Sequence, residues 1–412
     1  MPETRTLILA DDLTGANDTA IQFRKYGFSA LVVTDIVRVD TALLNDYDVI
    51  AINSDSRRMC PDDAYRAVYD TVKAFEIANG SGFGVYKKVD SVLRGNPGRE
   101  LAAMMDALDI PLALIAPAFP ANRSVLEHGR LPSGADAVRI FADGSGRKTA
   151  NIPLATIRQG ALSIVAFMHT RNSRGTQVLV ADAVNDTDLE AIYAASTSLK
   201  KTHILTGSAG LANQLARNLG KEKDSIEEKP VVLSPIPALV VAGSRQGETA
   251  AQICALSQSL SLPIIRFKVS LVKQGKCDEA VREAQTEATE LMRRNIPVCI
   301  IAVESMFQPE TVNKHNAEKD EMDKAISEAL GVLTGRLFDE FYFSLLVSTG
   351  GDTSMGICRH LGISGMEPLQ EICPGIPLTR IVGGVYNGRF MITKSGRFGD
   401  QNTLLKILHR TD

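Results

Sequence analysis

The sequence lacks the cysteine and histidine spacings that mark common metal and redox sites. Its 412 residues include six cysteines, and no two of them form the C-x-x-C spacing of a zinc knuckle or a redox pair. The six histidines are scattered and form no H-E-x-x-H motif. Cys299, inside the apolar stretch PVCIIAV, is typical of a small core residue. The sequence therefore predicts reduced cysteines and assigns no metal ligands.

Long apolar runs and a strong charge bias are also missing. The chain has 45 Lys and Arg against 48 Asp and Glu, spread along its length, so no basic stripe marks a nucleic-acid or membrane-surface site. No apolar run is long enough to span a bilayer, and the first residues, MPETRTLILADD, lead straight into a strand instead of a signal peptide. We expect a soluble, cytoplasmic protein with no nucleic-acid or membrane partner.

Three frequent nucleotide-binding signatures are absent as well. There is no G-x-x-x-x-G-K-[ST], which excludes a P-loop enzyme, and no G-x-G-x-x-G after the first strand, which disfavours a standard dinucleotide site. The motif set of protein kinases is also missing. A nucleotide site in this chain would therefore belong to a less common family.

What is present is a regular alternation of short apolar strands and amphipathic helices. In the first half, strands such as TLILA, DVIAIN, GVYKKV and LALIAP precede helices predicted near residues 15–26, 61–79, 97–108, 186–199 and 209–219. Alternation restarts with ALVVAGS, and RIVGGVYNGRFMITKSG predicts a β-hairpin with a type I′ turn at Asn387-Gly388. This order is typical of right-handed βαβ units and mostly parallel sheets.

The alternation is interrupted once, at residues 222–237. This stretch, EKDSIEEKPVVLSPIP, combines a charge run with three prolines and is predicted to be a linker. The fold class that we predict is α/β, with two domains, residues 1–228 and 229–412, each with a mostly parallel sheet. We also expect a cleft between the two domains.

In the first domain, polar side chains follow several predicted strands directly. They comprise carboxylates, cations and a hydroxyl: Asp11, Asp12, Arg57, Lys88, Asp90, Ser91 and Arg94. Ligands of parallel sheets bind beyond the carboxyl ends of the strands, where these loops would meet. Carboxylates accept hydrogen bonds from hydroxyls, and Arg or Lys binds a carboxylate, so the mixture indicates a site for a small hydroxylated acid.

Each of these loops also has a structural explanation. Asp12 fits a helix-start residue near the positive end of the helix dipole, and Thr14 fits an N-cap. Arg57 would then be a solvated surface cation or part of a structural ion pair. One such loop alone would not identify a site, but three loops at one sheet edge favour binding.

The second domain carries glycines at two predicted strand–helix junctions. Gly243-Ser244 ends one strand, and Thr349 to Thr353, TGGDT, ends another. Glycine lets the backbone approach an anion, and a helix N-terminus supplies N–H donors, so phosphate is the expected guest. A tight turn would explain either glycine group alone. Two similar junctions together favour nucleotide phosphates.

These segments resemble the four-carbon acid sugar kinases over nearly the whole chain. LADDLTGANDTA, KKVDSVLRGNPGRE and APAFPANR are similar to the sugar-acid-binding domain of that family, and AGSRQGETAAQ, STGGDTSMG and KSGRFGD to its nucleotide-binding domain. The resemblance implies ATP-dependent phosphorylation of the terminal (4-) hydroxyl of D-threonate, D-erythronate or 3-oxo-tetronate. Leu13 in ADDLTGAND resembles the D-threonate branch.

The resemblance also implies roles for single residues. Substrate would contact Asp11, Arg57 and the stretch of Lys88, Asp90 and Ser91; ATP would contact Ser244, Gly350, Gly351, Asp352, Thr353 and Gly396. Arg397 stands where the family pattern has glycine after KSG.

The mechanism expected from these residues is phosphoryl transfer with Mg²⁺ bridging the β- and γ-oxygens of ATP. Arg57, with Lys88 or Arg94, would bind the substrate carboxylate, while Asp11 and Asp90 would hold its hydroxyls. The sequence leaves two alternatives for the catalytic base. It is either Asp352, beside an anion-binding helix start, or one of Asp11 and Asp12, facing the terminal hydroxyl.

Two other functions also fit two α/β domains. A nicotinamide-dependent sugar-acid dehydrogenase is disfavoured by the missing G-x-G-x-x-G. A non-catalytic sugar-acid binding protein stays open. A homodimer is the default expectation for the assembly, because two-fold dimers are the commonest oligomers.

Overall fold

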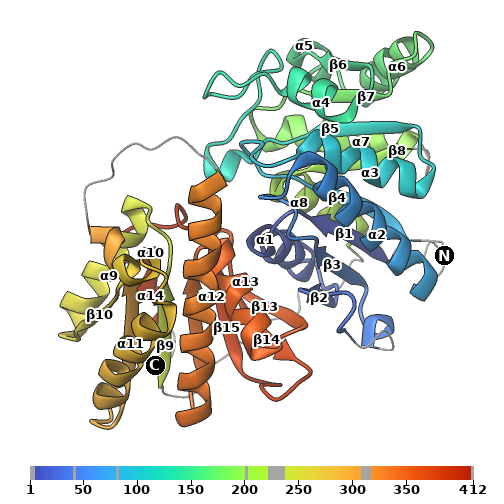
Figure 1. The fold of residues 1–412 in the computed structure, drawn as a ribbon. Coiled ribbons are helices and arrows are strands. Elements are labelled where there is room, and N and C mark those ends of the chain that lie inside the picture. Colours follow the sequence, from blue (N-terminus) through green and yellow to red (C-terminus); the bar gives the residue numbers. More distant parts are fainter. Residues whose placement is uncertain are drawn as a thin grey trace. The chain divides into compact units, whose positions relative to one another are not determined.

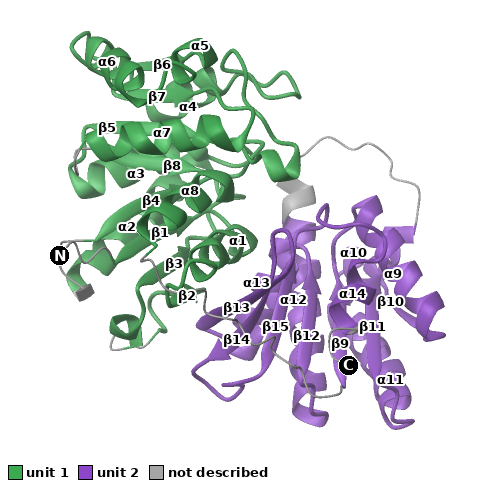
Figure 2. Ribbon diagram, turned by 180° about the vertical axis from the view of Figure 1, so that it is seen from behind, with its two compact units in different colours: residues 1–226 green, residues 227–412 purple. Residues whose placement is uncertain are grey.

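The computed structural model describes residues 5–39, 43–79, 83–199, 203–220, 237–307 and 317–409. They divide into two compact units, Met1–Ile226 and Glu227–Asp412 (Figure 2). The predicted boundary between residues 228 and 229, and all but the last residue of the predicted linker, lie outside the described residues. No described helix combines the length and the apolar character that crossing a membrane requires.

Unit 1 (Met1–Ile226) contains a parallel sheet with the strand order β2-β3-β1-β4-β8-β5-β7-β6 (Figure 1). Its central strands are mostly apolar and buried on both faces, as TLILA in β1 shows, which is typical of parallel sheets. The strands are β1 (Thr6–Ala10), β2 (Ala30–Val33), β3 (Val49–Asn53), β4 (Gly84–Lys88), β5 (Leu112–Ala116), β6 (Thr149–Ile152), β7 (Val178–Ala181) and β8 (His203–Gly207).

The helices of unit 1 pack in two rows. Helices α1, α8 and α7 lie side by side, and α2, α3 and α4 form the other row. Right-handed crossovers place the two rows on opposite faces of the sheet. The helices are α1 (Leu13–Arg24), α2 (Pro61–Asn79), α3 (Pro97–Leu108), α4 (Ala137–Ser145), α5 (Leu154–Ile157), α6 (Ala161–Asn172), α7 (Asp186–Ser198) and α8 (Ala209–Leu219).

Unit 2 (Glu227–Asp412) has the strand order β10-β11-β9-β12-β15-β14-β13, in which the first five strands pair in parallel and β14 runs antiparallel to both of its neighbours, β15 and β13. The strands are β9 (Ala238–Ala242), β10 (Ile264–Phe267), β11 (Val298–Val303), β12 (Leu345–Thr349), β13 (Gly365–Cys373), β14 (Ile376–Val382) and β15 (Phe390–Lys394). The helices are α9 (Gly247–Leu260), α10 (Val269–Lys273), α11 (Cys277–Met292), α12 (Ala317–Glu340), α13 (Gly351–Leu361) and α14 (Thr403–His409).

The predicted α/β class with mostly parallel sheets is confirmed, and the predicted helices at residues 61–79, 97–108 and 209–219 match α2, α3 and α8. The predicted hairpin is present as β14 and β15. The prediction of a type I′ turn at Asn387-Gly388 is wrong. Residues 383–389 separate the two strands, and Asn387 lacks the positive φ that this turn needs. Asn387 instead closes the loop, accepting a hydrogen bond from Gly383 N at 2.9 Å.

Helices α12 and α13 approach each other closely through two glycines. A side chain at Gly331 would place its Cβ 2.5 Å from Gly356 O, and one at Gly356 would collide with the carbonyl of Ser327. Helix α13 begins at the TGGDT segment that the sequence assigns to phosphates. The glycine contact therefore fixes the position of that helix start.

Gly356→Ala is expected to lower the free energy of unfolding by about 1–3 kcal/mol, because overpacking a close contact costs that much. Gly335→Ala, also in α12, is the matched control, because no atom lies within 4 Å of its Cβ position. It should raise stability by roughly 0.5–1 kcal/mol through helix propensity. Urea unfolding followed by circular dichroism measures both. A stable Gly356→Ala protein would contradict the packing argument.

Candidate functional site

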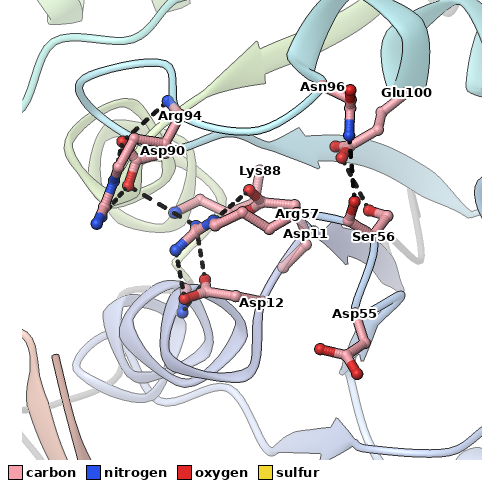
Figure 3. A network of polar contacts seen from close by, with 12 residues as sticks. Asp11, Asp12, Asp55, Ser56, Arg57, Lys88, Asp90, Arg94, Asn96 and Glu100 are labelled. Atoms are coloured by element: carbon pink, nitrogen blue, oxygen red, sulfur yellow. Dashed lines mark hydrogen bonds and ion pairs between the residues drawn. The ribbon is translucent and has the colours of Figure 1, made fainter. Parts of the chain in front are cut away.

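Three loops of unit 1 meet at the carboxyl edge of neighbouring strands. Strand β1 pairs in parallel with β3 on one side and with β4 on the other, so the loops that follow them open at the same edge. Asp11 and Asp12 follow β1, Arg57 follows β3, and Asp90 follows β4. The structure thus brings these predicted residues together, as Figure 3 shows.

Arg57 is the centre of this cluster. Its Nε donates to Asp11 Oδ2 at 2.7 Å and its Nη2 donates to Asp11 Oδ1 at 2.9 Å. On the other side, Nη1 and Nη2 donate to the two carboxylate oxygens of Asp12 at 2.6 and 2.8 Å. Asp90 Oδ2 lies 3.7 Å from Nη2. The planar guanidinium therefore binds two carboxylates in bidentate fashion, an arrangement available to Arg and not to Lys.

The electrostatics keep the carboxyl groups of Asp11 and Asp90 ionised. Burial acts to raise the pKa of Asp11, but the charge and hydrogen bonds of Arg57, with the charges of Lys87 and Lys88, hold it below the ordinary value. For Asp90, burial is likewise outweighed by the hydrogen bond from Arg94 and by nearby cations, so its pKa is also lowered. An ionised carboxylate only accepts hydrogen bonds, which suits it to bind hydroxyl groups.

Asp12 has two functions in this structure. Its Oδ1 accepts a hydrogen bond from Gly15 N at 2.8 Å, so Asp12 is the N-cap of α1 as well as a partner of Arg57. Thr14, the alternative N-cap, lies inside α1. The structural and the site interpretations of Asp12 are therefore compatible.

Lys88 differs from the other cations of the site. Its side chain is buried, with 4% of the residue exposed, yet its ammonium makes no hydrogen bond or ion pair with any residue that the structure describes. It lies against Gly15, where an added Cβ would stand 2.8 Å from Nζ. Its charge lowers the pKa of Asp11 and of Asp90. A buried cation without a direct partner is suited to bind an anionic ligand.

Arg94 and Ser91 complete the predicted group. Arg94 is half exposed and donates from Nε to Asp90 Oδ1 at 3.1 Å and from Nη2 to Oδ2 at 2.5 Å. The Ser91 carbonyl accepts a hydrogen bond from Ser124 Oγ at 2.7 Å, which links this loop to the APAFPANR loop after β5. Sequence reasoning did not single out Glu100, which lies beneath this edge, although it stands in the motif GNPGRE.

In unit 2, three glycine-containing loops converge beyond β9, β12 and β15, which are parallel neighbours. A Cβ on Gly243 would collide with Thr353 Oγ1, and a Cβ on Gly396 would collide with Ser244 Oγ. Gly350 N donates to Lys394 O at 2.9 Å. The predicted residues Ser244, Gly350, Thr353 and Gly396 therefore lie together at one edge.

Two helix starts at this edge have no side-chain cap. Gly350, at φ 103°, is the N-cap of α13, and Gly351, Asp352 and Thr353 form its first turn. Gln246 is the N-cap of α9, and its side chain does not cap the helix either. The N–H groups of an uncapped first turn, with the positive end of the dipole, form an anion-binding site.

The loop after β15, which carries Gly396, is held by buried side chains. Lys394 is fully buried, and its Nζ donates to Ser395 O at 2.9 Å and to Phe398 O at 3.1 Å. Burial lowers the pKa of Lys394 to about 8. Thr249 Oγ1 donates to Gly396 O at 2.8 Å. Arg397, which stands where the family resemblance predicts glycine, donates to Gln246 Oε1 at 3.1 Å. Arg397 thus contacts the N-cap residue of α9.

Comparisons with known proteins agree with this division into two units. A sugar-binding N-terminal domain family matches residues 6–135 and 127–215, and a nucleotide-binding C-terminal domain family matches residues 239–404. A crystal structure from Salmonella typhimurium LT2 has the same fold, with a TM-score of 0.76 at 21% identity over 98% of both chains.

Curated relatives match nearly the full length. A D-threonate kinase of Salmonella typhimurium is 27% identical over 98% of both chains. A D-erythronate kinase of Heliobacterium modesticaldum is 26% identical over 97% of this chain and 95% of the relative. A 3-oxo-tetronate kinase of Burkholderia multivorans is 26% identical over 98% of this chain and 96% of the relative. With both domain families matched in order, the chain belongs to the four-carbon acid sugar kinase family.

Proposed function

We propose that this protein transfers the γ-phosphate of ATP to the 4-hydroxyl of a four-carbon sugar acid, with D-threonate as the first candidate and D-erythronate and 3-oxo-tetronate as alternatives. The observation that carries the proposal is the cluster at the edge of unit 1. There, ionised carboxylates surround Arg57, and the buried ammonium of Lys88 has no hydrogen bond or ion pair within the described residues. Such a site offers acceptors for hydroxyls and a cation for a carboxylate.

The contacts of the cations support different roles for Arg57 and Lys88. Arg57 has most of its donors engaged by Asp11 and Asp12, so we propose that it organises the hydroxyl-binding carboxylates. Lys88, with the half-exposed Arg94, would then bind the carboxylate of the sugar acid. Ser91 would add a hydroxyl contact. A point charge such as Lys88 tolerates several orientations of the substrate carboxylate. The aspartate carboxylates of the protein would instead select among the configurations of the substrate hydroxyls.

For the nucleotide, the proposed ligands are Ser244, Gly350, Gly351, Asp352, Thr353 and Gly396. The uncapped starts of α9 and α13 support phosphate binding at this edge. Among the described residues, no three metal-ligating side chains form a group that could hold a metal ion. This fits Mg²⁺, which binds mainly to phosphate oxygens and water and takes one or two carboxylates from the protein. We propose Asp352 or Glu248, in the first turns of α13 and α9, as the carboxylate ligand of the ion. When bound, the ion neutralises charge that develops on the phosphates.

We propose Asp352 as the catalytic base. Both oxygens of Asp11 and of Asp12 accept hydrogen bonds from Arg57, and the lowered pKa of Asp11 makes it a weak proton acceptor. Asp352 stands in the first turn of α13, beside the proposed phosphate site. Direct transfer requires the γ-phosphate to reach the sugar acid, so we propose that catalysis includes closure of the two units around their ligands.

ADP release should be observed with at least one of D-threonate, D-erythronate and 3-oxo-tetronate in a coupled assay with Mg·ATP. The matched 4-deoxy acid should give no release, because it lacks the acceptor hydroxyl. Thermal stabilisation by NAD(H) but not by ATP or ADP, with no ADP release from any acid, would instead indicate a dehydrogenase.

Substituting the three candidate bases one at a time should separate their roles. Asp352→Asn is expected to lower kcat by about 10²-fold or more with little change in the KM for sugar acid, as for loss of a general base. Asp12→Asn and Asp11→Asn should mainly raise the KM for sugar acid. Steady-state kinetics of the three variants provides the test. Near-normal turnover in Asp352→Asn would rule out this assignment.

The two sites should respond to substitution independently. Gly396→Ala should raise the KM for ATP by about tenfold or more and leave the KM for sugar acid within about twofold, because its Cβ collides with Ser244 Oγ. Lys88→Met should show the opposite pattern. Gly335→Ala, which meets no atom within 4 Å, is the control for both. Parallel changes of both KM values in either variant would contradict the assignment of the sites to separate units.

A further inference from the structure

A buried ion pair lies directly beneath the sugar-acid site and takes no part in the proposed chemistry. Lys87 Nζ, at the end of β4, is 2.8 Å from Glu100 Oε2 of α3, and the side chains are 0% and 1% exposed. Neither group reaches solvent. Removing two charges from water is costly, and apolar side chains of similar size often stabilise a core equally well. Packing alone therefore does not explain this pair.

The remaining polar atoms of the pair are directed at the site loops. Lys87 Nζ donates to the carbonyl of Lys88 at 2.9 Å and to that of Leu9 at 3.4 Å. Leu9 precedes Asp11 by two residues on β1. The ammonium therefore links the ends of β1 and β4, from which the carboxylates of the site project.

Glu100 holds the third loop through Ser56, the residue before Arg57 (Figure 3). Ser56 is fully buried, and its Oγ donates to Glu100 Oε1 at 2.8 Å. The same Oγ lies 2.8 Å from Ser54 Oγ, which donates to the carbonyl of Ala10 at 2.9 Å. The network thus joins α3, the loop after β3 and the end of β1.

Neighbouring contacts leave the backbone of Arg57 little freedom. Asn96 Nδ2 donates to Ser56 O at 3.3 Å and to Met59 O at 2.9 Å, which closes the loop around Arg57. Arg57 N donates to Asp11 O at 3.2 Å. A Cβ at Gly95 would stand 3.1–3.3 Å from three atoms of Arg57. A displacement of Ser56 would therefore move the Arg57 guanidinium with it.

We propose that Lys87 and Glu100 are positioning residues for the sugar-acid site: their ion pair, acting through Ser56 and the carbonyls of Leu9 and Lys88, sets the places of Arg57, Asp11 and Lys88. The inference rests on the proposed function, because its effect is measured on sugar-acid phosphorylation. Neither residue touches substrate. Their contribution is to hold the site loops within the narrow range that binding geometry allows.

The test measures both KM values and the melting temperature for four variants of the full chain. Glu100→Gln keeps an acceptor for Ser56 but removes the charge, and Ser56→Ala removes the hydroxyl that joins Glu100 and Ser54 to the loop of Arg57 and leaves the ion pair in place. The double variant Lys87→Met with Glu100→Met replaces the ion pair by an apolar pair. Asp188→Asn is the control, since Asp188 is a buried carboxylate on α7 that contacts Arg158 and Val184 N.

The KM for sugar acid should rise about tenfold or more in Glu100→Gln and in the double variant, and by less in Ser56→Ala. The KM for ATP should stay within about twofold in all of them, and the double variant should melt no lower than Glu100→Gln. Asp188→Asn should lower the melting temperature and leave the KM for sugar acid unchanged.

An unchanged KM for sugar acid in Glu100→Gln and Ser56→Ala would overturn the inference, whatever happens to the melting temperature. Ser56→Ala changes one atom, so it keeps the test available if a charge-removing variant fails to fold. Absence of wild-type turnover with every four-carbon acid would refute the proposed function, and the inference with it. If the wild-type protein turns over and the KM for sugar acid of the variants equals that of the wild type, only the inference is refuted.

Discussion

The double ion pair of Arg57 with Asp11 and Asp12 is the interaction on which the proposed sugar-acid site depends. Three carboxylates, those of Asp11, Asp12 and Asp90, stand at one buried sheet edge and would repel one another without a shared cation. The fork of the guanidinium compensates two of them at once and joins the loop after β3 to the loop after β1. Because the cation comes from a different strand than the carboxylates, the site forms only when the sheet has formed.

The two proposed sites use different chemical groups at equivalent places, the carboxyl ends of parallel strands in each unit. Unit 1 uses side-chain charges at the strand ends, which suits an acid with several hydroxyls. Unit 2 uses glycines and uncapped helix starts, where the backbone N–H groups face the edge, which suits phosphates. Each unit also buries a lysine near the end of a strand. Lys87 in β4 donates to the carbonyls of Lys88 and Leu9 at the ends of β4 and β1, and Lys394 in β15 donates to the carbonyls of Ser395 and Phe398 in the loop that follows it. A buried ammonium has three donors and can therefore hold several carbonyls at once.

The sequence predicted the repeating parts of this fold because they are local. Helix α2 begins with Pro61 followed by two aspartates, and helix α3 begins with Pro97, and both were placed to the residue. The segment from α4 to α6 was not predicted. Its strand β6, TANI, is a partly exposed edge strand without an apolar run, so it carries no periodic signal. The hairpin β14–β15 was predicted but its turn was not, because the Asn-Gly pair lies inside a longer loop closed by the Asn387 side chain.

The sequence by itself determined which residues stand at the strand ends, because strand periodicity and helix starts are set by neighbouring residues. It therefore placed Asp11, Arg57 and Asp90 in loops that meet at one edge, and Gly243 and Gly350 at two similar strand–helix junctions, whereas Gly396 was indicated only by the family resemblance. The tertiary structure alone decided how those residues are paired. Arg57 binds Asp11 and Asp12, Lys88 lacks a direct partner among the described residues, and Glu100 reaches Lys87 and Ser56 beneath the site. These choices depend on distances between strands that are far apart along the chain, and no local pattern encodes such distances.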